Sequence, residues 1–272
     1  MIDLLGVMLD NNIISCRHHG GGNVLANKRR NFVIEKINKH GKVEIDQLAE
    51  QLDVSPMTIR RDLALLEEAG QLIRSFGGAV LPQVLVQETP FHTKEAHYGE
   101  QKKQIALKAM KFIEKGQTLL LDSGTTTLEL ARLLKTEHDL TIVTNDIKIA
   151  AELIDSNLKV IMIGGEMQNN IGAVFGAQAS QFIETIHVDL FFLGAHAVDI
   201  DAGVTSPSID KSYLKQQMMN AAESTWLLAD SSKLNMKAFS NVCDLLTLTG
   251  FITDDDITDS MKKAINDYVE VL

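Results

Sequence analysis

The segment from Val43 to Arg74 constrains the fold of this chain more than any other stretch. Apolar residues recur at helical spacing from Ile45 to Leu52, and two further residues then provide a short turn. Ser55 is a favourable cap for the next helix, and Pro56 is tolerated at a first helical position because the N–H of that position has no helical partner. The spacing therefore predicts two short helices joined by a tight turn.

The second predicted helix has distinct inner and outer faces. Its apolar residues Ile59, Leu63 and Leu66 share the inner face, so the polar and basic residues near its N-terminus point outward. In a helix-turn-helix this outer face enters the DNA major groove and meets phosphates and base edges. We therefore expect Ser55, Met57, Thr58, Arg60 and Arg61 to contact DNA in the groove, and Lys42 and Arg74 to contact the flanking phosphates. The alternative is an ordinary helical hairpin with a solvated charged face.

The segments on either side complete a winged domain. A first helix is predicted over residues 27–39, and residues 71–80 read as a two-stranded wing. Residues 42–44 form a short strand that pairs with the wing in this interpretation. We place the winged helix-turn-helix domain at residues 27–82, with the helix-turn-helix motif itself at about 43–62.

Charge is distributed unevenly along the chain. Residues 28–82 hold nine Lys and Arg against eight Asp and Glu, whereas residues 83–272 hold sixteen against twenty-six. The formal net charge of −10 would argue against nucleic-acid binding by a single domain. With the chain divided into these two segments, we predict that the first lies on double-stranded DNA and that the acidic remainder faces away from the phosphates.

The first 26 residues read as a non-native or disordered extension. They lack a clear periodicity and contain three consecutive glycines. A purine-rich ribosome-binding site translates readily into Gly-Gly, and Val24 fits a GUG start codon. Cys16, His18 and His19 have the chemistry of metal ligands, but no second ligand pair follows at a suitable spacing, so we expect no metal site.

Composition also bears on the compartment. Two cysteines far apart in the sequence, Cys16 and Cys243, suggest no disulfide framework and fit a reducing cytoplasm. No apolar run reaches the length of a membrane span, and the start of the chain lacks a basic segment and a cleavage site for a signal peptide. We expect a cytoplasmic protein without a membrane partner or a cofactor.

The rest of the chain predicts an α/β domain. After a linker over residues 83–99 and a helix that starts at residue 100, short apolar strands alternate with amphipathic helices to the end of the chain. Such alternation favours a mostly parallel sheet covered on both faces. We assign residues 100–272 to this second domain and expect it to bind an effector and to form a homo-oligomer.

Four polar loops follow predicted strands, where ligands bind in parallel sheets. They are residues 122–127 (DSGTTT), residues 144–146 (TND), Gly164 with Gly165, and residues 230–233 (DSSK). The first offers hydroxyls, free N–H groups and a helix N-terminus, which suit a phosphate or a carboxylate. The alternatives are a simple helix cap for that loop and a surface role for Lys233.

These motifs resemble one family over nearly the whole chain from Leu25. SPMTIRRDLALLEEAGQLIRSFGGAVL resembles the winged helix-turn-helix of the DeoR family of bacterial transcriptional regulators, and DSGTTT, VTN, FLGA, GVTSP and ADSSK resemble its effector domain. The resemblance implies a fold similar to ribose-5-phosphate isomerase and glucosamine-6-phosphate deaminase. It further implies that an anionic effector contacts Asp122, Ser123, Gly124, Thr125, Thr126, Asn145, Gly164, Gly165 and Lys233.

One departure from the family bears on the effector. The family often has an acidic residue in an E-A-x-x-K pattern, whereas this chain has Lys211 there, followed by Lys215. A lysine attracts a second negative group, so we predict that Lys211 contacts the effector and that the effector is a sugar acid or its phosphate. The alternative is that Lys211 points into solvent.

Three functions fit these features. The first is a repressor of a carbohydrate or sugar-acid catabolic operon, bound to a DNA operator and released by a small anionic effector. The second is a sugar-phosphate isomerase or deaminase with a DNA-binding arm, for which Asp199, Asp230 and His196 are candidate bases. The third is a constitutive DNA-binding module. We expect the regulator, because no paired acid and base stand in a dedicated motif.

Overall fold

The computed structural model describes residues 22–68, 71–75, 77–80, 85 and 88–272. The chain divides into two compact units, Met1–Pro82 and Gln83–Leu272. The expectations for residues 1–21, including those for Cys16 and the two adjacent histidines, lie outside the described residues. None of the described helices combines the length and the apolar character needed to span a membrane.

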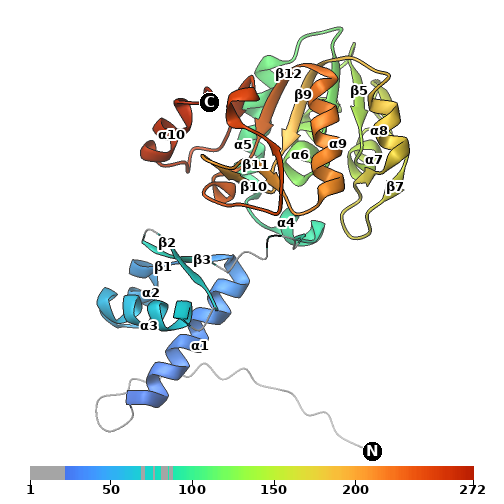
Figure 1. Ribbon diagram of the computed structural model, residues 1–272. Helices are drawn as coiled ribbons and strands as arrows, with labels where there is room; N and C mark the ends of the chain where they lie inside the picture. Colours follow the sequence, from blue (N-terminus) through green and yellow to red (C-terminus); the bar gives the residue numbers. More distant parts are fainter. Residues whose placement is uncertain (1–21, 69–70, 76, 81–84, 86–87) are drawn as a thin grey trace, which may run out of the picture. The chain divides into compact units, whose positions relative to one another are not determined.

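The first unit is a winged helix-turn-helix (Figure 1). Its elements are α1 (Gly22–His40), β1 (Lys42–Glu44), α2 (Ile45–Gln51), α3 (Pro56–Glu68), β2 (Ile73–Ser75) and β3 (Gly78–Val80). The three strands form one antiparallel sheet in the order β1-β3-β2, as the predicted pairing of residues 42–44 with the wing requires. Gly78 must be glycine because a Cβ there would lie 2.0 Å from the carbonyl oxygen of Val43.

The three helices enclose a small apolar core. Val33 and Ile37 of α1 and Ile59 and Leu63 of α3 are fully buried in it. The first helix starts earlier than the predicted residue 27, because α1 begins at Gly22. Residues 25 and 26 are Leu and Ala, which favour helix, so the helix continues toward the N-terminus.

The second unit is built on a six-stranded parallel sheet in the order β14-β12-β9-β4-β5-β6. The strands are β4 (Thr118–Leu121), β5 (Thr141–Thr144), β6 (Lys159–Met162), β9 (Val188–Gly194), β12 (Ala222–Leu228) and β14 (Gly250–Ile252). The helices are α4 (Phe91–Ala96), α5 (Gly99–Ala109), α6 (Thr125–Leu134), α7 (Ile147–Glu152), α8 (Ala177–Ile183), α9 (Ile209–Asn220) and α10 (Asp259–Asn266). The predicted fold class is therefore confirmed.

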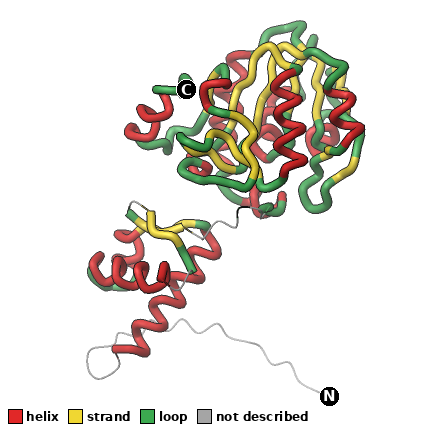
Figure 2. The backbone as a smooth tube through the Cα atoms, in the orientation of Figure 1, coloured by secondary structure: helices red, strands yellow, loops and turns green. Residues whose placement is uncertain are grey.

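Helices cover both faces of this sheet, which gives three layers (Figures 1 and 2). Side chains alternate along each strand, so Leu119 and Leu121 pack with α4–α7, while Leu120 packs with α8–α10. The apolar strands are thus buried on both sides, as parallel strands usually are.

Several short elements were not predicted. They are three 3₁₀ turns, η1 (Met110–Phe112), η2 (Ser231–Lys233) and η3 (Leu245–Thr247), a hairpin of β7 (Glu166–Met167) and β8 (Val174–Phe175), and an antiparallel sheet of β10 (Ala197–Asp199), β11 (Gly203–Ser206) and β13 (Ser240–Cys243). Elements of two to four residues are too short to show a periodicity.

The segment over residues 83–99 is more than the linker we expected. Residues 91–96 form α4, and Phe91 is buried in the core of the second unit beside α6. The aromatic ring of Phe91 also lies 4.1 Å from the Nζ atom of Lys148, and its backbone N–H donates to the carbonyl oxygen of Asn170 at 3.1 Å. A six-residue helix carries too little periodic signal to be recognised before its burial is known.

Candidate functional site

The recognition helix α3 begins as the sequence predicts. The Ser55 hydroxyl accepts a hydrogen bond from the backbone N–H of Thr58 at 3.2 Å and lies 3.0 Å from the Thr58 hydroxyl. These contacts satisfy a donor that a helix N-terminus otherwise leaves free. Ser55 and Thr58 therefore hold the first turn of the helix, in addition to the DNA contacts expected of them.

The outer face of α3 is available for DNA. Ile59 and Leu63 are fully buried, while Met57, Arg60 and Arg61 are exposed, so the orientation predicted for this helix is correct. Neither arginine has an ion pair with a residue that the structure describes, and Lys42 is exposed in β1. The contacts of these residues with DNA remain a prediction.

Unlike Arg60 and Arg61, Arg74 forms an ion pair with an acidic residue of the same unit. Its Nε atom donates to the carboxylate of Glu67 at 2.7 Å, and its backbone N–H donates to the same group at 2.9 Å. The hydrogen bond from the Arg74 backbone, followed by the one from its side chain, lowers the pKa of Glu67. A phosphate would have to compete with this carboxylate for Arg74.

A buried ion pair between Arg29 of α1 and Asp62 of α3 was not predicted. Only 4% of Asp62 is exposed, and a buried polar group needs a partner of this kind. A signal was present in the sequence, because Asp62 has the helical spacing of the inward-facing Ile59, Leu63 and Leu66. The pair fixes the recognition helix against α1.

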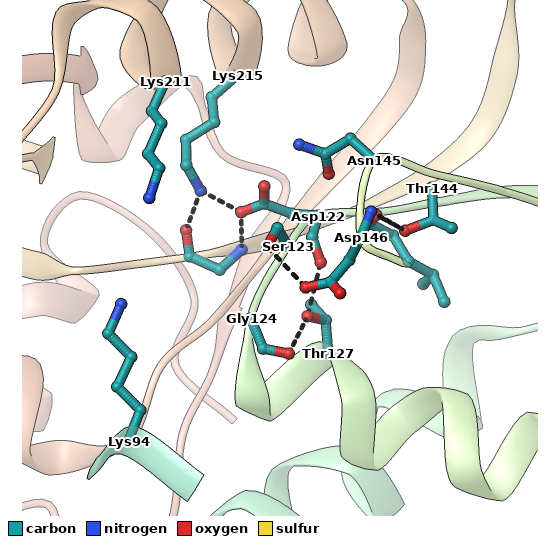
Figure 3. Close-up of polar contacts among 12 residues, drawn as sticks. Lys94, Asp122, Ser123, Gly124, Thr127, Thr144, Asn145, Asp146, Lys211 and Lys215 are labelled. Carbon is teal, nitrogen blue, oxygen red and sulfur yellow. Dashed lines mark hydrogen bonds and ion pairs between the residues drawn. The ribbon is translucent and has the colours of Figure 1, made fainter. Parts of the chain in front are cut away.

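In the second unit, the predicted loop after β4 is held by its own polar groups (Figure 3). The Thr127 hydroxyl donates to the carbonyl oxygens of Asp122 and Gly124, at 2.7 and 3.0 Å. Thr125 and Thr126 are largely buried in the first turn of α6. The first N–H groups of this ten-residue helix have no partner within the helix, which suits an anion.

Lys215 of α9 joins this loop and was not among the predicted contacts. Its ammonium forms an ion pair with the buried carboxylate of Asp122 and donates to the carbonyl oxygen of Gly194 at 2.8 Å. The same Asp122 oxygen accepts from the N–H of Gly194 at 2.9 Å. The ends of β4 and β9 therefore meet at one lysine (Figure 3). The signal was the E-A-x-x-K pattern, whose lysine this is.

The end of β5 adds a second set of polar groups. The Ser123 hydroxyl donates to the carboxylate of Asp146 at 2.6 Å. Burial raises the pKa of Asp146, and the hydrogen bond from Ser123 opposes that shift. Asn145 donates through Nδ2 to the carbonyl oxygen of Val174 at 3.1 Å, while its Oδ1 is buried without a partner. Since Nδ2 is fixed, Oδ1 is an acceptor that needs a donor.

The two predicted glycines are explained differently. Gly165 has a φ of +154°, and a Cβ there would lie 2.4 Å from the carbonyl oxygen of Phe175. The close approach that requires glycine at position 165 is therefore an approach to the backbone of the chain itself, at Phe175. A Cβ on Gly164 would meet nothing within 4 Å, so the structure gives no steric reason for glycine there.

Lys211 does not extend into solvent, so that alternative is wrong. Its Nζ lies 2.6 Å from one carboxylate oxygen of Glu88, and the Nζ of Lys94 lies 2.5 Å from the other. Lys211 and Lys94 point toward one another from α9 and α4 (Figure 3). Glu88 and Lys94 were missed because both belong to the segment we read as a linker.

His196 and Lys233 belong to the same neighbourhood. Burial lowers the pKa of His196 to about 4, helped by the positive charge of Lys94 and opposed by Glu88, so the imidazole is neutral at pH 7. Burial also lowers the pKa of Lys233, and Asp230 opposes that shift. In the described residues, no group of three or more His, Cys, Asp and Glu side chains is placed to hold a metal ion.

Comparisons with known proteins find a family match for each of the two units. The profile of the DeoR-like helix-turn-helix domain matches residues 29–84, and that of the DeoR C terminal sensor domain matches residues 98–255. The chain is 31% identical over 242 residues to the glycerol-3-phosphate regulon repressor of Escherichia coli K12, across 89% of this chain and 96% of that protein. It is 34% identical over 248 residues to the lactose phosphotransferase system repressor of Staphylococcus epidermidis, across 90% and 98%.

Among solved structures, ribose 5-phosphate isomerase A of Methanocaldococcus jannaschii aligns with a TM-score of 0.38 and 16% identity, over 50% of this chain and 54% of that one. The sequence matches are far more extensive. A sensor profile that spans more than half of the chain, and relatives above 30% identity along nearly their whole lengths, lead to one conclusion. This chain belongs to the DeoR family of DNA-binding transcriptional regulators.

Proposed function

We propose that this protein represses a carbohydrate or sugar-acid catabolic operon and leaves its operator when a phosphorylated sugar or sugar acid binds the second unit. The observation that carries the proposal is the loop of residues 122–127, where free N–H groups of α6 lie beside the Lys215–Asp122 pair. A phosphate suits the helix N-terminus, since charge and donors favour an anion there. The names of the two repressor relatives, which refer to glycerol-3-phosphate and to lactose, support a carbohydrate signal.

The unpartnered Oδ1 of Asn145 supports a polyol as the rest of the effector. An amide oxygen accepts hydrogen bonds and cannot donate them. A buried acceptor without a partner costs free energy, which a hydroxyl group of a ligand would recover. A sugar phosphate or a phosphorylated sugar acid offers such a hydroxyl next to its anionic group, whereas inorganic phosphate alone does not.

A binding role fits the two candidate carboxylate bases better than catalysis does. The carboxylate of Asp199 accepts from two backbone N–H groups at 2.9 Å and from Lys237 at 3.1 Å. Asp230 accepts from the backbone and the hydroxyl of Ser232. Both carboxylates are thus occupied in shaping their own turns, and a general base must reach the substrate's proton.

We further propose that the protein acts in the cytoplasm as a homo-oligomer, because two half-sites bind DNA more tightly than one.

Thermal unfolding of the full chain against sugar phosphates and phosphorylated sugar acids tests the sensor role. A ligand of the native state raises the melting temperature by mass action. The variant Ser123→Asp places a second carboxylate beside Asp146 and should abolish the rise. Ser260→Asp, at an exposed position in the first turn of α10, is the matched control and should keep it. Stabilisation that survives in Ser123→Asp would place the ligand elsewhere.

A further inference from the structure

Two lysines from different helices share one carboxylate beside the proposed effector site. The carboxylate of Glu88 receives Lys94 of α4 at 2.5 Å and Lys211 of α9 at 2.6 Å. All three side chains are mostly buried: the exposed fraction is 17% for Glu88, 22% for Lys94 and 13% for Lys211. Two cations therefore converge on a single anion away from bulk water, where such contacts are strong.

The lysines are held on fixed elements. Helix α4 is anchored by the buried Phe91 at its start and by Lys102 of α5 at its end. The Lys102 ammonium donates to the carbonyl oxygens of Lys94 and, at 2.5 Å, of His97. Lys211 lies on α9, a twelve-residue helix whose inner face is packed in the core. The core thus fixes the two helices from which the lysines extend.

Glu88 is held differently. It lies in neither a helix nor a strand, two residues before Pro90, and the second unit begins only five residues earlier at Gln83. Burial raises the pKa of Glu88, but its pairing with Lys94 and Lys211 outweighs burial and holds the pKa at about 2. Of the three partners, the carboxylate is the one that regular structure does not fix.

We propose that Lys94 and Lys211 form a second anion subsite, that Glu88 fills it in the absence of ligand, and that the carboxylate of a phosphorylated sugar acid displaces Glu88 when it binds. The inference rests on the proposed function, because the phosphate of the same molecule takes the loop of residues 122–127. A neutral hydroxymethyl group cannot replace a carboxylate between two ammonium groups. The two lysines therefore make the site select acids over alcohols, while Glu88 competes with the acid for them.

Glu88→Gln tests this directly, because it removes the competing charge and keeps the shape of the side chain. Matched probes differ only at one carbon: 3-phosphoglycerate against glycerol 3-phosphate, and 6-phosphogluconate against glucitol 6-phosphate. Isothermal titration calorimetry on the full chain should show the variant binding an acid roughly tenfold more tightly than the wild type, because an internal competitor is gone. Affinity for the matched alcohol should change less than about twofold. Glu95→Gln, on α4 and paired with Arg132, is the control and should match the wild type.

Lys211→Gln keeps the proposal falsifiable if Glu88→Gln does not fold, and it should abolish the preference for the acid. If both phosphorylated classes bind the wild type but Glu88→Gln treats acid and alcohol alike, the subsite is refuted and the sensor role stands. If Glu88→Gln binds the acid more weakly, Glu88 supports the site instead of competing for it, which also refutes the proposal. Failure of every probe to bind any of the proteins would refute the proposed function as well.

Discussion

Lys215 and Asp122 form a buried ion pair that joins helix α9 to the end of strand β4. Only 2% of the Asp122 side chain and 13% of the Lys215 side chain are exposed. The carboxylate also accepts from Gly194 at the end of β9, so one pair connects a helix with the carboxyl ends of two central strands. The loop that we propose to bind phosphate begins at this carboxylate.

Removal of one partner of this pair should destabilise the second unit. Lys215→Met leaves the carboxylate of Asp122 buried without its cation, which should lower the free energy of unfolding by about 3 kcal/mol. Urea unfolding followed by tryptophan fluorescence reports on this unit, because the single tryptophan is Trp226 of β12. Lys263→Met removes an exposed lysine from α10 and should change little. An equal loss in the two variants would contradict the structural role of the pair.

The ion pair between Arg29 and Asp62 should control how firmly the recognition helix is held. Asp62→Asn leaves the guanidinium of Arg29 without its charge partner and should weaken the packing of α3 on α1 by about 2 kcal/mol. Hydrogen exchange measures this locally, as faster exchange of the α3 amides. Asp46→Asn, in the first turn of α2, serves as the control. Unchanged protection of α3 in Asp62→Asn would contradict the assignment.

Glu67 should weaken DNA binding, because it occupies Arg74. Glu67→Gln releases the guanidinium toward phosphate, so affinity for DNA should rise and the slope of log K against log salt should steepen by about 0.9. Glu68→Gln removes the same charge from the next residue without freeing Arg74, so it separates this contact from a general change in charge. If the two variants have the same salt slope, Arg74 makes no phosphate contact.

His196 should make the protein less stable in mild acid. Burial, aided by Lys94, Lys233 and Lys211 and opposed by Glu88, lowers the pKa of His196 from 6.5 to about 4. Between these values the unfolded chain binds the extra proton and the folded one does not, so stability falls as pH is lowered through this window. We expect a loss of about 1–2 kcal/mol between pH 7 and pH 5, after allowance for partial exposure.

Urea unfolding of the wild type and of His196→Gln over this pH range measures the effect. The variant should lose most of the slope between pH 6.5 and pH 4. Glu88 acts in a separate window, since its pKa is lowered from 4.5 to about 2 and its stabilising contribution is lost only as pH falls below 4.5. A slope in His196→Gln as steep as in the wild type would assign the acid sensitivity to other groups.

Local signals explain what the sequence predicts well. Ser55 and Pro56 mark the start of the recognition helix, and alternation of apolar strands with helices identifies the parallel sheet. The loop of residues 122–127 could be located because ligand sites in such sheets follow the strands. Each of these inferences depends on residues that are close together in the chain.

Pairs of residues far apart in the chain could not be predicted in the same way. Arg29 and Asp62 are 33 positions apart, Asp122 and Lys215 are 93 apart, and Glu88 and Lys211 are 123 apart. Helical spacing marks Asp62 as inward-facing and the E-A-x-x-K pattern marks Lys215, but neither signal says which distant residue is the partner. Only the packing of the elements brings each pair together. Lys211 shows the consequence, because its residue type suggested a charged ligand while its partner Glu88 lay in an assumed linker.

The most direct test of the account is the affinity of the full chain for its operator as effectors are added. The operator is first selected from random duplex DNA, and binding is followed by fluorescence anisotropy at fixed salt. At least one phosphorylated sugar or sugar acid should weaken binding roughly tenfold or more, as an effector that prefers the DNA-free state must. Ser123→Asp should bind the same DNA without that response. Specific DNA binding that no compound of either class alters would contradict the account of this protein as a sugar-responsive regulator.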